Sequence, residues 1–339
     1  MTEDPERGPA QLALQLAPGA EAGAVLEAVP SPEALAGIAA AVPATVHFGT
    51  CGYLFPGWRE LVWRHERRRQ DLETTGLKEY GGCPLFRAIY LAPGVDAVPI
   101  DHDLRRIAAM VPPHVHAVLQ MHPEVTTPRF THADAALASG RSGSVNPHFL
   151  DSRFFLQEVM PHYLTAFGDR LGPLLFVFPP QLAKAGITPA AFAERLHRFL
   201  AALPPELDYA IELNETPYLT LTHAKLLAAF NVTHVFTTAF GMPPLFTQAR
   251  LVPKNPELIL HLVDPTGRGG ARRAELEPFD QIRDRQVDLR REVVRLLALM
   301  KDLPAYVVVD NELEGSAPLT ILALARMLVA AGSAAGSNG

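Results

Sequence analysis

The chain has 339 residues, of which 48% are hydrophobic, 36 are acidic and 30 are basic. A net charge of -6 with only 19% charged residues argues against a whole-surface electrostatic grip on nucleic acid or anionic lipid. Two cysteines cannot build a disulfide framework or a thiolate metal site. We expect a cytoplasmic protein, because the first residues are acidic rather than basic and no apolar run approaches the roughly 20 residues of a membrane span.

The two ends of the chain differ in composition from its middle. Residues 1–44 are rich in Ala, Pro, Gly and Glu, and we interpret them as a partly disordered N-terminal extension. One short helix is predicted at 31–41, where Ser31 and Pro32 supply the cap and the first turn. Residues 329–339 are small, and we expect a disordered tail there. The predicted folded domain is therefore 45–328.

Within this domain, eight short runs rich in β-branched and aromatic residues alternate with helical patterns. Most of the runs are continuously apolar, as expected for strands that helices bury on both faces. Eight such units predict an α/β fold, a (β/α)8 TIM-type barrel in a single domain, with a doubly wound open sheet as the alternative. The predicted strands are 46–51, 86–91, 116–121, 174–179, 209–213, 233–238, 258–263 and 305–310, and the predicted helices include 101–110, 152–167, 189–203, 219–230, 286–300 and 319–330.

Functional groups of such a barrel project from the carboxyl ends of its strands and from the loops that follow them. We interpret Cys51, at the end of the first strand, as a small packing residue, because nucleophilic use needs a nearby base and a lowered pKa. Cys83 precedes the second strand and is expected near the opposite rim. The strand-end rule selects Cys51, Tyr53, Gln120, His122, Glu212, Asn214, Thr237, Thr238, His261, Asp264, Asp310, Asn311, Glu312 and Glu314.

Several strings in the chain carry a family resemblance. They are GTCGYLFPGW at 49–58, FTH at 130–132, RLGPLLFVFPP at 170–180, YAIEL at 209–213 and YVVVDNELEGSAP at 306–318. In this order they resemble the YecE-like family, also called domain of unknown function family seventy-two, from about Thr45 to Leu328. The resemblance implies a TIM-type barrel, and His132 is retained from the family string. Since the activity of the family is not established, the resemblance implies no reaction and no cofactor.

The chain departs from the family pattern at several charged positions. Losing several charged groups from one pocket indicates a changed ligand or lost chemistry, because acid–base work needs titratable groups. The departures are Tyr90 or Leu91 for an acidic residue, Gln120 for a lysine, Asn214 for an arginine, Thr238 for an aspartate, His261 for an arginine and Asp264 for a glycine.

We therefore predict a polar rim pocket that binds or acts on a small polar metabolite, such as a sugar or a phosphate compound. His261 is the predicted acid or base, and Glu212 and Asp310 are predicted to orient the ligand in catalysis. The alternative is a divergent non-catalytic binding or regulatory protein that has lost the charged pocket residues of its family. The predicted ligand-binding residues are Tyr53, Gln120, His122, Asn214, Thr238, Asp264, Arg268 and Asn311.

The glycine- and arginine-rich loop PTGRGGARR, at 265–273, predicts an anion site. Glycines let backbone N–H groups approach a ligand, and Arg268 offers a planar fork to phosphate oxygens. The alternative is a solvated loop whose arginines pair with Asp264, Glu275 and Glu277.

Two other patterns give weaker predictions. Asp310, Glu312 and Glu314 could offer carboxylates to a divalent cation, but we favour a turn capped by Asp310 and Asn311 with both glutamates solvated. No pair among the 13 histidines has the spacing of a catalytic zinc motif, so no metal site is predicted. The basic run at 64–70 is interpreted as a solvated face. The expected partner is thus a small-molecule ligand, without nucleic acid; the sequence identifies no cofactor and does not set the oligomeric state.

Overall fold

The computed structural model describes residues 28–92, 101–130 and 142–336 and consists of a closed barrel of eight parallel strands. Each strand pairs with the next along the chain, and the last pairs in register with the first. This closure confirms the predicted barrel and shows that the open-sheet alternative was wrong. The strands are β1 (Val46–Cys51), β2 (Phe86–Leu91), β3 (His116–Gln120), β4 (Leu171–Phe178), β5 (Tyr209–Leu213), β6 (Thr233–Thr237), β7 (Leu258–Leu262) and β8 (Ala305–Val309).

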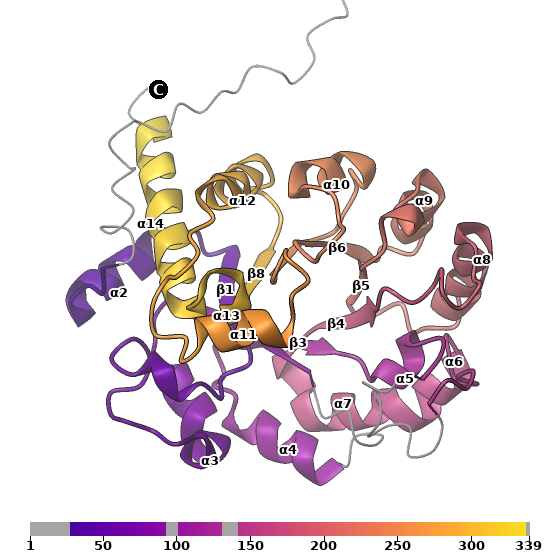
Figure 1. Ribbon diagram of the computed structural model, residues 1–339, viewed down its shortest axis with the longest axis horizontal. Helices are drawn as coiled ribbons and strands as arrows, with labels where there is room; N and C mark the ends of the chain where they lie inside the picture. Colours follow the sequence, from indigo (N-terminus) through magenta and orange to yellow (C-terminus); the bar gives the residue numbers. More distant parts are fainter. Residues whose placement is uncertain (1–27, 93–100, 131–141, 337–339) are drawn as a thin grey trace, which may run out of the picture.

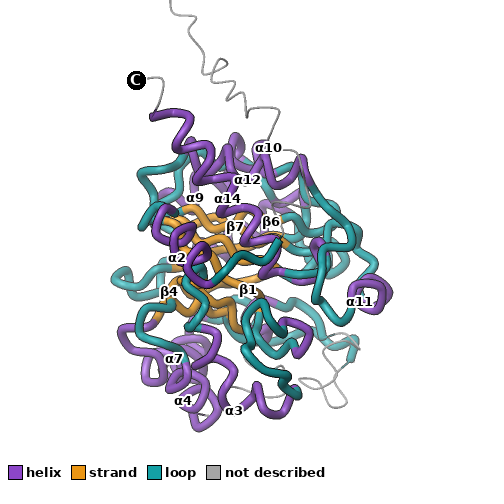
Figure 2. Tube along the Cα trace, turned by 90° about the vertical axis from the view of Figure 1, so that its left-hand side faces the viewer, coloured by secondary structure: helices purple, strands orange, loops and turns teal. Residues whose placement is uncertain are grey.

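Helices form a layer around the barrel, as Figures 1 and 2 show. The longer ones are α2 (Pro32–Ala41), α3 (Arg69–Tyr80), α4 (Asp101–Met110), α7 (Met160–Phe167), α8 (Pro189–Leu200), α9 (Leu221–Ala229), α10 (Leu245–Leu251), α11 (Gly270–Leu276), α12 (Val287–Leu299) and α14 (Ala317–Gly336). The short ones are α5 (Pro123–Thr126), α6 (Ser152–Phe154), which continues through a π-turn at Phe155–Val159 into α7, and α13 (Asn311–Glu314), with 3-10 turns at Pro56–Trp58, Gly168–Arg170 and Thr216–Tyr218. In Figure 1, α11 and α13 lie in front of the strands, inside the ring of helices.

The C-terminal helix α14 is longer than predicted. It continues past Leu328 to Gly336, so most of the expected tail is helical. The added residues include several alanines, which have the highest helix propensity, and Ala331 is buried. The packing of the first turns on the barrel nucleates a helix that alanine then extends.

The short helix α2 forms as predicted, with the Ser31 hydroxyl accepting a hydrogen bond of 3.3 Å from the backbone N–H of Ala34. It packs against α14, beside which it lies in Figure 1. The Arg87 guanidinium of β2 donates hydrogen bonds to the carbonyls of Ala39 and Pro43. This part of the N-terminal extension is therefore attached to the barrel.

Side chains from alternate positions of the strands fill the barrel, since successive residues of a strand point to opposite faces. The backbones of β1 and β2 approach closely at Gly49. A Cβ there would lie 2.3 Å from the carbonyl oxygen of Ala88, so the position requires glycine. The apolar filling consists of Ala88, Val118, Leu175, Ala210, Val235, Ile259 and Val308. At the carboxyl ends of the strands this filling gives way to polar side chains, which sets the position of the candidate site.

Within the ranges described here, no helix is both long and apolar enough to cross a membrane.

Candidate functional site

A buried acid–base pair lies at the carboxyl end of the barrel. Nδ1 of His261, on β7, is 2.7 Å from Oε2 of Glu212, on β5, and the two residues are only 7% and 2% exposed. Burial lowers the pKa of His261, but the charge of Glu212, the neighbouring Cys51 and hydrogen bonds to both raise it well above its usual value. Because Nδ1 faces the carboxylate, Nε2 is the nitrogen left for proton exchange with a ligand.

A stacked tyrosine fixes the imidazole from the side. The ring of Tyr90, on β2, lies 4.7 Å from that of His261 at an interplanar angle of 23°. Its hydroxyl donates a short hydrogen bond to Oε1 of Gln120, on β3. Burial and the nearby acidic groups raise the pKa of Tyr90 well above its usual value, so the hydroxyl remains a donor. Two strands thus hold the face of the imidazole, while Glu212 holds its edge.

Asp310 adds a second carboxylate beside the pair. It follows β8 and caps α13, with Oδ1 accepting a hydrogen bond of 2.7 Å from the backbone N–H of Glu312. Burial raises its pKa, although this hydrogen bond and the charges of His261 and Arg273 oppose the shift. The cap predicted for Asp310 is therefore present, and the carboxylate lies within the field of His261.

A pocket of about 560 Å³ opens next to these residues. Cys51, Tyr90 and Asp310 connect its lining to the acid–base pair, and Tyr53 and Leu104 contribute apolar surface. A cavity of this volume accommodates a small-molecule ligand. The mouth of the barrel and the pocket together form the candidate site.

Three arginines from helices outside the barrel also line the pocket: Arg69, Arg106 and Arg273. The nearest carboxylates of the first two lie 3.9 and 3.8 Å away, beyond hydrogen-bond distance. Strand-end reasoning missed Arg69 and Arg106, because they reach the site from α3 and α4, whereas Arg273 of α11 is the last residue of the loop predicted at 265–273. The lining also holds two carboxylates, Glu73 and Asp310, and Arg273 already pairs with Glu277 at 3.2 Å and Glu312 at 3.3 Å. Arg69 and Arg106 are therefore the guanidinium groups that favour an anion.

The family model described as protein of unknown function DUF72 matches residues 47–338 of the chain. The chain belongs to the DUF72 family. No curated protein matches it in sequence. Two crystal structures of DUF72 family proteins have the same fold. The protein from Enterococcus faecalis V583 is 12% identical, with a TM-score of 0.56 over 84% of this chain and 95% of that one. The protein from Thermotoga maritima MSB8 is 17% identical, with a TM-score of 0.54 over 84% and 98%.

Three of the predicted ligand-binding residues serve local structure in this DUF72 protein. His122 is fully buried and caps α5, its Nδ1 accepting a hydrogen bond of 3.3 Å from the backbone N–H of Glu124. The Thr238 hydroxyl holds β6 to β7, accepting from the N–H and donating to the carbonyl of Val263 at 2.7 Å each. The Asn311 side-chain oxygen accepts from the Trp58 indole at 3.0 Å and from the backbone N–H of Ala317 at 2.9 Å.

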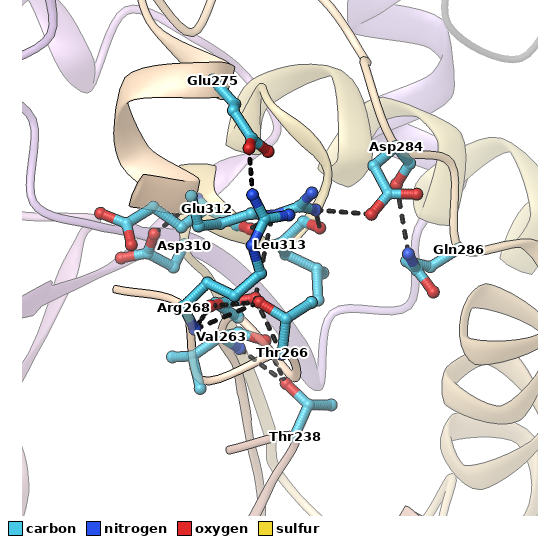
Figure 3. Close-up of polar contacts among 12 residues, drawn as sticks. Thr238, Val263, Thr266, Arg268, Glu275, Asp284, Gln286, Asp310, Glu312 and Leu313 are labelled. Carbon is cyan, nitrogen blue, oxygen red and sulfur yellow. Dashed lines mark hydrogen bonds and ion pairs between the residues drawn. The ribbon is translucent and has the colours of Figure 1, made fainter. Parts of the chain in front are cut away.

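The loop after β7 is organised by its own carboxylates (Figure 3). Asp264 accepts hydrogen bonds from the backbone N–H groups of Thr266 and Arg268, at 2.9 and 3.3 Å. The Arg268 guanidinium pairs with Glu275, and Arg272 lies 3.7 Å from Asp264. An anion would have to displace Glu275, so this loop matches the alternative in which its arginines pair with carboxylates.

Other predicted residues divide between the pocket and its surroundings. Tyr53 lines the pocket, and Gln120 reaches the site through Tyr90. Asn214 follows β5, and its side-chain oxygen is buried without a hydrogen-bond partner among the described residues. His132 lies outside the described residues.

The acidic string after β8 is not arranged as a cation site. Glu314 was expected to be solvated, but it is fully buried and its carboxylate lies 2.7 Å from the Arg290 guanidinium of α12. Glu312 lies 3.3 Å from Arg273. Across the described residues, no group of three or more His, Cys, Asp or Glu side chains could hold a metal ion.

Proposed function

We propose that this DUF72 protein binds a small anionic metabolite in the pocket at the carboxyl mouth of its barrel and acts on it by general acid–base catalysis. His261 is the acid or base, Glu212 orients it, and Asp310 is a second carboxylate beside the reacting atoms. The observation that carries the proposal is the 2.7 Å contact of His261 with Glu212 next to an open pocket.

A buried ion pair supports catalysis over passive binding. Removing two charges from water costs several kcal/mol, which their attraction offsets only in part. Apolar residues of similar size would close the barrel without that cost. A buried, coupled pair at the mouth of a pocket is instead typical of functional sites, where the pKa of an acid or base is tuned.

The chemistry of the lining supports an anionic ligand. Among the described residues, the carboxylates that pair with Arg69 and Arg106 lie 3.9 and 3.8 Å away, too far for a hydrogen bond. A planar guanidinium binds phosphate or carboxylate oxygens bidentately. Leu104 and Ile107 add an apolar wall from the same helix as Arg106. A sugar phosphate or a short hydroxy acid combines these features.

Binding is tested by thermal shift at low ionic strength, with inorganic phosphate and with a panel of sugar phosphates and short hydroxy acids. We expect the melting temperature of the wild type to rise by about 2–4 °C at saturating ligand, and Arg106→Ala to abolish the shift. Arg105→Ala removes the same charge from the adjacent position of α4, outside the pocket lining, and should retain it. Equal shifts in both variants would refute binding in this pocket.

Turnover of the compounds that bind is then followed by NMR, with melting curves measured in parallel. We expect His261→Gln to lower the rate per folded molecule at least 100-fold, since general acid–base catalysis contributes about 10²–10⁴-fold. An unchanged rate would remove His261 from the mechanism. Binding without turnover of any compound would support the non-catalytic alternative.

A further inference from the structure

Cys51 occupies a position in the proposed acid–base site from which it could act as a nucleophile. It is the last residue of β1, and its register partner on β2 is Tyr90, which stacks on His261. The half-buried thiol packs against the barrel-interior cluster that includes Tyr90 and lines the 560 Å³ pocket. Nearby His261 lowers the pKa of this thiol against the larger effect of burial. Three strands therefore bring a thiol, an imidazole and a carboxylate into one chain of contacts.

The order of these contacts is that of a catalytic triad, in which a base lies between a nucleophile and an orienting acid. Oε2 of Glu212 lies 2.7 Å from Nδ1 of His261, so Nε2 is the nitrogen left to exchange a proton with the thiol. Tyr90 restricts rotation of the imidazole by stacking on its face. The base is thus held in one orientation before any ligand binds.

The second cysteine provides an internal comparison. Burial raises the pKa of both thiols to about 11, so the pKa alone does not distinguish them. Cys83 is 9% exposed, and backbone hydrogen bonds at Leu85 and Phe86 oppose the increase of its pKa. At Cys51 the increase of the pKa is opposed by His261 instead. The Cys51 thiol rests protonated, so it needs a base at the moment of attack, as a serine does in a triad.

We propose that Cys51 is the nucleophile of a Cys51–His261–Glu212 triad that transfers the acyl group of an anionic ester or thioester; this inference rests on the proposed function of the same site. At a pH above the raised pKa of His261, where its imidazole is neutral, the thiol proton passes to Nε2 as sulfur attacks the carbonyl carbon. The bond to the leaving oxygen or sulfur breaks, and the leaving group takes that proton. Water attacks the resulting thioester as His261 receives a proton from it. The carbon–sulfur bond then breaks and the sulfur takes that proton from His261, which releases the acid and restores the free thiol.

The three arginines of the pocket define the substrate further. Arg69 of α3, Arg106 of α4 and Arg273 of α11 line the pocket. Cys51 belongs to the same lining. A negative group on the acyl part or on the leaving group therefore has a guanidinium within the cavity. Neutral esters lack this contact and should react more slowly than anionic ones.

The experiment uses 4-nitrophenyl acetate as a generic acyl donor at a series of pH values from 7 to 10, because His261 accepts a proton only above its raised pKa. Intact-mass and peptide mass spectrometry are the readout. We expect one acetyl group on Cys51 of the wild type and of Cys83→Ala, and none on Cys51→Ala. In His261→Gln we expect acetylation at least tenfold slower, because the general base is lost. Melting curves confirm that each variant is folded, and Cys51→Ser provides a second, nearly isosteric variant if Cys51→Ala fails to fold.

Two results would overturn the triad. One is no acetylation of Cys51, and the other is acetylation at the same rate in the wild type and in His261→Gln. Both leave the proposed function testable, since the thermal shift that depends on Arg106 does not involve Cys51. Loss of that shift with His261-dependent acetylation intact would refute the ligand-binding proposal and retain the nucleophile.

Discussion

His261 is a buried base between a carboxylate and an aromatic ring, and this environment should determine how stability responds to pH. Glu212, Cys51 and Asp310 interact with it electrostatically, and Tyr90 stacks on it. Its pKa in the folded protein lies well above the usual 6.5. The folded state therefore holds a proton that the unfolded state releases, and the free energy of unfolding falls as pH rises through that interval.

We predict that the stability difference between the wild type and Glu212→Gln depends on pH. Below about pH 6.5 the ion pair contributes fully, and the variant should be about 3 kcal/mol less stable. The difference should shrink as pH rises through the raised pKa of His261, because the wild type then loses its cation. Urea unfolding of the two proteins from pH 6 to pH 10 measures the stability difference and its dependence on pH.

Comparing the two proteins also removes the contribution of Glu257. Burial and the charge of Asp208 raise the pKa of Glu257 to about 7. The free energy of unfolding of both proteins therefore falls as pH rises from about 4.5 to 7. This slope is common to them and cancels in the difference. A difference that stays constant across the pH range would show that His261 does not hold the extra proton.

At the scale of elements, one buried ion pair ties the last three helices together. Glu314 of α13 accepts hydrogen bonds at 3.0 and 2.7 Å from the Arg290 guanidinium of α12. It also accepts at 2.6 Å from the Thr320 hydroxyl of α14 and from the backbone N–H of Gln286. This carboxylate therefore helps to hold α13 behind Asp310, together with Arg272, which donates hydrogen bonds to the carbonyls of Glu312 and Leu313 at 3.1 and 2.9 Å.

We predict that Glu314→Gln lowers the free energy of unfolding by about 3–5 kcal/mol, because it breaks a fully buried ion pair by removing the charge of one partner. The matched control is Glu194→Gln, which removes an exposed pair with Arg198 at 3.5 Å and should cost less than about 0.5 kcal/mol. Urea unfolding measures both variants. Equal losses would mean that burial gives the Glu314 pair no special importance.

At the scale of the whole molecule, the closed ladder argues for one folding unit. β8 pairs with β1 from Val46 to Thr50, so the two ends of the predicted domain support each other. Dividing the barrel would create four unpaired strand edges, which are unfavourable in water. We therefore expect residues 45–328 to unfold together.

Limited proteolysis checks this expectation. A protease site is introduced into the loop at 201–208, between α8 and β5, and the folded protein is digested over time. We expect cleavage to be followed by digestion of both fragments, since neither half retains a closed core. Two fragments that persist and melt separately would show that the barrel consists of two independent halves.

Local patterns in the sequence were enough to predict the strands and their order. Runs such as AYVVV in β8 and LLFVF in β4 are apolar throughout, because helices bury both faces of a parallel strand. The strand-end rule also selected His261, Glu212 and Asp310 before any contact was known. The short helices α10 and α11 were missed because their seven residues carry little periodicity.

Contacts between distant residues were decided only by the closed barrel. His261 and Glu212 are 49 residues apart, and β6 separates their strands, so no local pattern relates them. The same holds for Cys51, because its neighbour His261 lies on β7 and cannot be seen from the sequence around the cysteine. Glu314 looked solvated in its string, yet the packing of α12 and α14 buries it. The sequence by itself determined the strands and most of the longer helices, since propensity and periodicity act over a few residues, whereas the register and closure of the barrel decided which side chains meet.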